Sequence, residues 1–203
     1  STFYCKDEEV LCFLPSDHYI KNNKKFIQGL LKAYKIALNN KLVILGLKSK
    51  EPNINYGYIK YKKNYIFKDS FEVDSFTEKP KKAKAIRLHK LGALWNSGIV
   101  IVRNSYLKSL FNQFNKNLYS LVRKSYLHSR KEMEFIFLDK KGWDQIPSIS
   151  FDYAILEKEF KKVVVKLDII WSDLGTFESI YKVKKSIGNV KNINTENCFS
   201  FSN

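Results

Sequence analysis

The chain has 203 residues, 44% of them hydrophobic and 15% aromatic, which suits one domain with a sizeable core. No run of roughly 18 apolar residues occurs, and no basic start precedes an apolar stretch, so we expect neither a membrane span nor a signal peptide. The net charge of +16 would favour nucleic-acid binding, but 32 of the 36 basic residues are Lys and they are spread along the chain. A solvated surface therefore explains the charge best, with an anionic substrate or polymer as the alternative.

The first half begins with a pattern typical of α/β proteins. Residues 10–14 form a short apolar run that predicts a buried strand, and the loop at 15–18 follows it. Apolar residues then recur at helical spacing over 26–38, and 42–47 predicts a second buried strand. This strand, helix, strand order places the chain in the α/β class.

The rest of the chain continues the same alternation. The patterns predict strands at 56–61, 71–77, 98–102 and 163–165, and helices at 82–91, 105–114, 118–128, 152–158 and 176–186, with a loop at 171–175. No internal repeat or low-complexity linker interrupts them. The three cysteines form no CxxC pair, which predicts neither a disulfide framework nor a zinc site and favours a cytoplasmic location.

Two aspartates in loops after predicted strands are candidate metal ligands. Asp17 and Asp173 each follow a buried strand, which is where open α/β sheets bind ligands. Mg²⁺ commonly takes one or two protein carboxylates and completes its shell with water and substrate phosphate. Local turn bonding by Asp17 and N-capping of the helix at 176 by Asp173 are the structural alternatives.

Three short segments carry candidate substrate-binding residues. Glu78 and Lys79 end a predicted strand with an acceptor and an ammonium side by side, a pair suited to a sugar hydroxyl and a phosphate. Asn96 stands at the head of an apolar strand, and Gly57 joins two aromatic residues. An exposed ion pair, a turn and a strand bulge are the respective structural alternatives.

Six motifs, taken in order, resemble the mannose-1-phosphate guanylyltransferase family. They are LPSDHYI (14–20), YGYI (56–59), FTEKP (76–80), LWNSG (94–98), ISFDYAILE (149–157) and WSDLG (171–175). The resemblance extends from Val10 to about Phe201. It implies a Rossmann-like nucleotide-diphospho-sugar transferase fold, a mixed sheet flanked by helices that lacks its first strands.

The resemblance also implies a reaction and roles for the candidate residues. The phosphate oxygen of mannose-1-phosphate attacks the α-phosphorus of GTP, giving GDP-mannose and pyrophosphate. Asp17 and Asp173 match the Mg²⁺ ligands and Lys79 the phosphate contact, so these three are the expected catalytic residues. The expected substrate-binding residues are Gly57, Glu78, Lys79, Asn96, Asp152 and Glu157.

The family's glycine-rich loop, which holds the GTP phosphates, is expected to precede Ser1. We therefore expect residues 1–190 to form a partial catalytic domain and 191–203 to begin a C-terminal extension. Activity of this chain alone is doubtful on this basis, and the alternative is a non-catalytic companion that binds sugar phosphate or a complete enzyme. An exposed sheet edge is expected, together with oligomerisation or pairing with a chain that supplies the N-terminal part.

Overall fold

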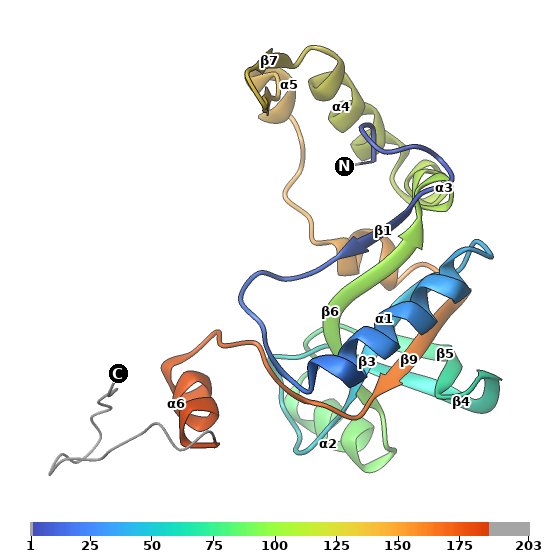
Figure 1. Ribbon diagram of the computed structural model, residues 1–203, viewed down its shortest axis with the longest axis vertical. Helices are drawn as coiled ribbons and strands as arrows, with labels where there is room; N and C mark the ends of the chain where they lie inside the picture. The colour runs from blue at the N-terminus through green and yellow to red at the C-terminus, as the bar shows by residue number, and fades with distance from the viewer. Residues whose placement is uncertain (1, 187–203) are drawn as a thin grey trace, which may run out of the picture.

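A six-stranded mixed sheet forms the centre of the computed structural model, which describes residues 2–186 (Figure 1). The strand order is β1-β6-β3-β9-β5-β4, and only β3 and β9 run parallel to each other. The strands are β1 (Val10–Phe13), β3 (Leu42–Lys48), β4 (Tyr58–Phe67), β5 (Ser70–Thr77), β6 (Leu94–Arg103) and β9 (Lys162–Leu167). The expected mixed α/β architecture is confirmed.

Two hydrophobic layers cover the two faces of the sheet. Along β3, Val43 and Leu45 pack toward the helices α1 (Asn23–Ala37) and α2 (Lys82–Lys90). The alternate residues Leu42 and Ile44 pack toward α3 (Asn104–Phe114) and the single π-helical turn η1 (Asp152–Leu156). A strand buried on both faces needs apolar residues at every position, which is why β3 is a continuous apolar run.

Close packing of α1 on the sheet depends on a small residue. A Cβ added at Gly29 would lie 2.3 Å from Leu167 Cδ2, so any larger residue there would require the buried Leu167 side chain of β9 to move. Ala33 and Ala37, one and two turns further along α1, are fully buried. This stripe of small residues holds α1 against the centre of the sheet.

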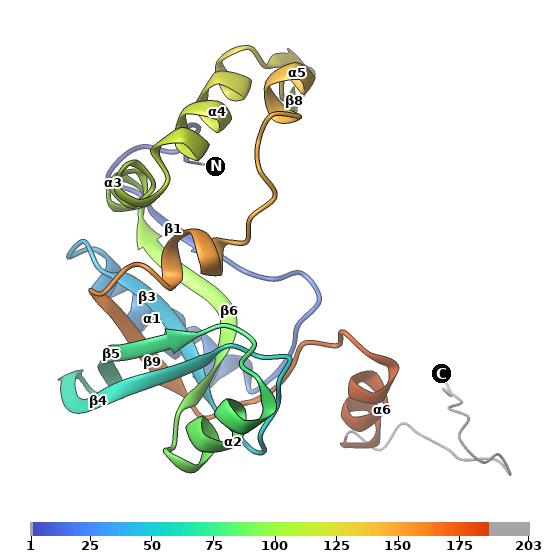
Figure 2. The ribbon, with the colours of Figure 1, turned by 180° about the vertical axis from the view of Figure 1, so that it is seen from behind.

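An arm extends beyond the end of β6, as both ribbon views show (Figures 1 and 2). It consists of α3, α4 (Lys116–Leu127), the hairpin of β7 (Arg130–Glu132) and β8 (Phe135–Phe137), and α5 (Lys140–Trp143). The hairpin and α5 were not expected from the sequence. Asp139 caps α5, because its Oδ2 accepts a hydrogen bond from Gly142 N at 2.7 Å.

The first strand is less buried than the sequence predicts. Among the described residues β1 pairs only with β6, so it lies at the edge of the sheet, and Cys12 and Phe13 are exposed. The expectation of a buried strand at 10–14 was therefore wrong: the run is apolar, but no second strand covers it. The open edge itself agrees with the sequence, whereas oligomerisation through it stays a prediction.

A two-stranded ribbon lies outside the main sheet. β2 (Tyr19–Lys21) pairs antiparallel with β10 (Ile170–Ser172), with Tyr19 opposite Ser172. Residues 171–172 therefore belong to a strand, although the sequence predicts a loop at 171–175. The helix α6 (Phe177–Ser186) follows, and the expected C-terminal extension at 191–203 lies outside the described residues.

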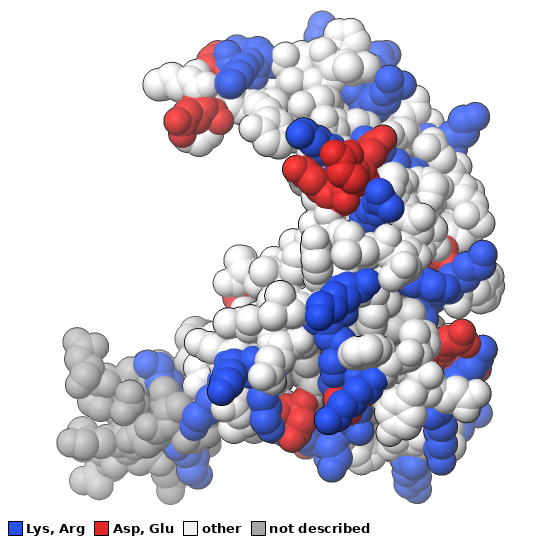
Figure 3. Space-filling view, turned by 45° about the vertical axis from the view of Figure 1, so that its right-hand side comes forward, with Lys and Arg blue, Asp and Glu red and all other residues white. Residues whose placement is uncertain are grey.

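The charged surface is scattered. On the face shown in Figure 3, Lys and Arg side chains lie over the arm, the middle and the base of the molecule, with Asp and Glu between them. This agrees with the spread of lysines along the sequence. None of the helices between residues 2 and 186 has the length and apolar character needed to cross a bilayer.

Candidate active site

A cavity of about 170 Å³ collects most of the residues that the sequence singles out. Five expected site residues line it, namely Gly57, Glu78, Asn96, Asp152 and Asp173. The other lining residues are Pro15, His18, Asn55, Tyr56, Ser97, Gly98 and Trp171. Residues from six motifs thus surround one small space, although the lining runs from Pro15 to Asp173 in the sequence.

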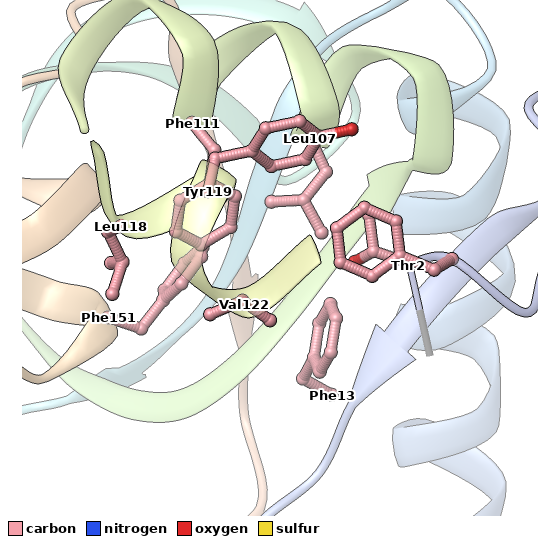
Figure 4. A pocket seen from close by; sticks show the side chains of 9 residues that line it. Thr2, Phe13, Leu107, Phe111, Leu118, Tyr119, Val122 and Phe151 are labelled. Atoms are coloured by element: carbon pink, nitrogen blue, oxygen red, sulfur yellow. The ribbon is translucent and has the colours of Figure 1, made fainter. Parts of the chain in front are cut away.

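A second, apolar cavity of about 250 Å³ lies between the arm and β1 (Figure 4). Its walls include Phe13, Phe111 and Phe151, and the side chains drawn there carry no charged group. It offers nothing to neutralise a phosphate or hold a cation. The chemistry suggested by the motifs therefore belongs to the smaller, polar cavity.

Asn96 is fixed in orientation by hydrogen bonds at both ends of its amide. Its Nδ2 donates to Asp152 Oδ1 at 3.1 Å, and its Oδ1 accepts from Gly98 N at 3.2 Å. The backbone N–H of Asn96 donates to Gly57 O at 2.8 Å. Through its side chain and backbone, Asn96 therefore connects β6 to η1 and to the residue before β4, and it also lines the cavity.

Glu78 lies in a cluster of carboxylates. Its side chain is only 12% exposed, and its backbone N–H donates to Glu157 Oε1 at 3.3 Å. Burial raises the pKa of Glu78 to about 7, and the nearby charges of Asp152 and Glu157 raise it further, against the opposing effect of Lys79. Burial also raises the pKa of Asp152. Near neutral pH, Glu78 therefore exchanges between a hydrogen-bond donor and an acceptor.

Replacement of Glu78 by Gln should change how stability depends on pH. The folded state keeps a proton on Glu78 that the unfolded chain loses between pH 4.5 and about 7, so wild type loses stability as pH rises through that window. Glu78→Gln stays neutral and lacks this loss. The free energy of unfolding of Glu78→Gln minus that of wild type should therefore increase by about 1–3 kcal/mol from pH 4.5 to pH 8. Urea denaturation at pH 4.5 and at pH 8 measures this difference. If the difference is the same at both pH values, folding does not raise the pKa of Glu78.

Two residues beside the cavity have left-handed backbone conformations. Lys79 has φ 39° and Leu174 has φ 49°, although neither is glycine. Such conformations cost energy and are often found at functional sites.

Lys79 extends its side chain outward, 64% exposed, with Nζ 3.9 Å from Glu78 Oε1. Its ammonium is therefore accessible at the mouth of the cavity, where it can meet an anion.

Asp173 does not cap the helix that follows it. Thr176 performs that role, because its Oγ1 accepts from Ser179 N at 3.1 Å. The Asp173 carboxylate instead lies beside Tyr56, whose pKa is raised to about 12 by burial first and then by the charge of Asp173 and a hydrogen bond with it. The helix-cap alternative for Asp173 is thus excluded, and its carboxylate is directed to the cavity.

The ribbon of β2 and β10 brings the two candidate metal ligands to one end. Asp17 lies two residues before β2 and Asp173 directly follows β10, so both lie at the same end of this antiparallel pair, where Tyr19 is opposite Ser172. Within residues 2–186 no group of three or more His, Cys, Asp or Glu side chains is arranged to hold a metal ion. Two carboxylates nevertheless fit Mg²⁺, which takes hard oxygen donors and leaves its remaining positions for water and phosphate.

Asp17, Lys79 and Glu157 adjoin the cavity without lining it. Asp17 is exposed and lies 3.9 Å from His18 Nε2, measured from its Oδ1. His18, Tyr56 and Trp171 also line the cavity. Aromatic residues often line sugar sites, which was the signal for Tyr56 beside Gly57. His18 was expected to be structural, and Trp171 was noted only as part of the motif of Asp173.

Comparisons with known proteins agree with this fold. The sequence model of the nucleotidyl transferase family matches residues 1–190. Mannose-1-phosphate guanylyltransferases from Sinorhizobium fredii and Salmonella typhimurium are each 32% identical, over 204 and 178 residues. These alignments cover 97% and 87% of this chain but 40% and 37% of the relatives. The chain thus spans about two fifths of the length of these curated relatives.

A solved structure described as a mannose-1-phosphate geranyltransferase from Thermus thermophilus shares the fold. It has a TM-score of 0.76 at 24% identity and covers 86% of this chain and 49% of its own. The mixed sheet flanked by helices defines an α/β domain. With the match over residues 1–190, the chain belongs to the nucleotidyl transferase family.

Proposed function

We propose that this chain takes part in nucleotidyl transfer from GTP to mannose-1-phosphate, giving GDP-mannose and pyrophosphate. The observation that carries the proposal is the convergence of Gly57, Glu78, Asn96, Asp152 and Asp173 on one polar cavity. The 32% identity to mannose-1-phosphate guanylyltransferases supports the choice of substrates. In the reaction a phosphate oxygen of the sugar phosphate bonds to the α-phosphorus of GTP, and the bond from that phosphorus to the bridging oxygen of pyrophosphate breaks.

In this proposal the cavity binds the hexose. The Asn96 amide is already oriented by Asp152, and Glu78 presents a carboxyl group that either donates or accepts. Such groups fix sugar hydroxyls in a geometry suitable for attack. Glu157 supports this arrangement by accepting the backbone hydrogen bond of Glu78.

Two further elements act on the phosphates. The exposed ammonium of Lys79 lies beside Glu78 at the mouth of the cavity, which suits the phosphate of the bound sugar. Asp17 and Asp173 would hold Mg²⁺, which neutralises charge on the reacting phosphates when bound. The protein's own contribution is then positioning of the sugar phosphate and of the two carboxylates.

Pyrophosphate release by the purified chain tests the proposal. Turnover with GTP, mannose-1-phosphate and Mg²⁺ that EDTA abolishes would show that this chain is active by itself, since two carboxylates without a cation repel the phosphates. Absence of turnover together with Mg²⁺-dependent, salt-insensitive binding of mannose-1-phosphate would instead support a companion subunit. Binding that ignores mannose-1-phosphate and falls steeply with salt would point to nucleic acid and contradict the proposal.

A further inference from the structure

A hydrogen bond joins His18 to Trp171 across the ribbon end. Trp171 Nε1 donates to His18 Nδ1 at 3.2 Å, and the two rings meet edge to face at 88° with their centroids 5.0 Å apart. An indole N–H is only a donor, so His18 Nδ1 must act as the acceptor. The neutral His18 ring therefore carries its proton on Nε2, and Trp171 selects this tautomer.

The protonated nitrogen of His18 is on the side of a candidate metal ligand. Nε2 lies 3.9 Å from Asp17 Oδ1, which is longer than a direct hydrogen bond but close enough for a favourable electrostatic contact. The His18 side chain is 11% exposed, so little water screens this contact on the imidazole side. The ring thus has one nitrogen bonded to Trp171 and the other beside Asp17.

The surrounding chain leaves His18 little freedom. A Cβ added at Gly98 would lie 3.7 Å from His18 Cε1 and 3.2 Å from Pro15 Cγ, so β6 passes close beneath the loop. Trp171 is held in turn by Tyr56, with ring centroids 5.3 Å apart, and by pairing with Ile20 in the ribbon. The loop that carries Asp17 is therefore fastened to the strand that leads into Asp173.

We propose that His18 is a positioning residue: bonded to Trp171, it holds the Asp17 loop against β10 and so sets the arrangement of the two carboxylates that bind a divalent cation. The inference rests on the proposed function for the assignment of Asp17 and Asp173 as ligands. Residues that orient metal ligands commonly change metal affinity by 10-fold or more when they are replaced.

Four variants of the full chain separate the possible roles of His18. His18→Phe keeps a ring but has no acceptor, whereas the side-chain oxygen of His18→Asn can occupy the Nδ1 position. Trp171→Phe removes the donor and keeps a smaller aromatic ring, and the double variant combines it with His18→Phe. The probe is Mn²⁺ alone, with free ion measured by electron paramagnetic resonance, so no turnover is required.

We expect His18→Phe and Trp171→Phe each to weaken Mn²⁺ binding about 10-fold, and the double variant to be no weaker than either. His18→Asn should retain most of the affinity. Additive losses, or equal losses in His18→Asn and His18→Phe, would overturn the positioning role. If His18→Phe keeps the wild-type Mn²⁺ affinity while Asp173→Asn loses it, the role of His18 is overturned and the metal site stands. If Asp173→Asn also keeps the wild-type Mn²⁺ affinity, the proposed metal site is overturned.

¹⁵N NMR of the histidine ring gives a second readout that is independent of any metal. Wild type should show His18 as the neutral tautomer with its proton on Nε2, and Trp171→Phe should shift the Nδ1 resonance because the hydrogen bond to it is lost. A wild-type ring protonated on Nδ1 instead would overturn the inference, since such a nitrogen cannot accept from Trp171.

Discussion

Asp173→Asn should lower the rate of pyrophosphate release by about 100-fold or more while leaving the chain folded. The side chain keeps its size, but one of the two carboxylates at the end of the ribbon loses its charge. Electrostatic stabilisation of reacting phosphates is commonly worth a factor of 100 to 1,000 for one group in a water-poor site. The loss should appear both in turnover and in the Mg²⁺ dependence of mannose-1-phosphate binding.

Thr176→Ala is the matched control for this variant. Thr176 caps α6 through Ser179 N, so its replacement should cost about 1 kcal/mol of stability and leave the carboxylates untouched. If Asp173→Asn behaves like Thr176→Ala, with a small loss of stability and normal turnover, Asp173 serves only the local structure. Comparison of Asp173→Asn with Thr176→Ala therefore distinguishes a metal ligand from a residue that only stabilises the start of α6.

The main elements could be predicted because their signals are local. The apolar run of β3 and the helical spacing of α1 result from burial on a sheet with two covered faces, and both were found. The ribbon of β2 and β10 was missed, since each strand has three residues and shows no period of its own. It exists because segments about 150 residues apart meet, which a pass along the chain does not reveal.

In the candidate site, too, residues within single motifs could be predicted, whereas interactions between distant motifs could not. The resemblance predicted Gly57, Glu78, Asn96, Asp152 and Asp173, and the structure places all five around one cavity. The raised pKa of Glu78 depends on burial and on carboxylates from η1 and the residue after it, so no single motif predicts it. The bond between His18 and Trp171 spans 153 positions and depends on ring orientation, which sequence alone does not give.

Gly57→Ala should raise the KM for mannose-1-phosphate by about 10-fold to 100-fold with little unfolding. A Cβ at Gly57 would lie 2.5 Å from Glu78 Oε2, and 3.2 Å from both Asn96 Cβ and Phe76 Cζ. The Glu78 carboxyl is the end of a flexible side chain, so it moves while the backbone stays. Displacement of a positioning group by about 1 Å is enough for a 100-fold effect. Initial rates at varied sugar phosphate measure the change.

A double-mutant cycle decides whether the methyl group acts through Glu78. In a Glu78→Ala background the space beside Gly57 is free, so Gly57→Ala should add little to the loss already caused. Gly175→Ala is the steric control, because its Cβ would lie at an ordinary 3.5 Å from Asp173 Oδ2. Additive losses at Gly57 and Glu78 would contradict the mechanism and place the effect on Asn96 or Phe76. Non-additive losses would mean that glycine is required at 57 because the Glu78 carboxyl occupies the space a side chain would fill.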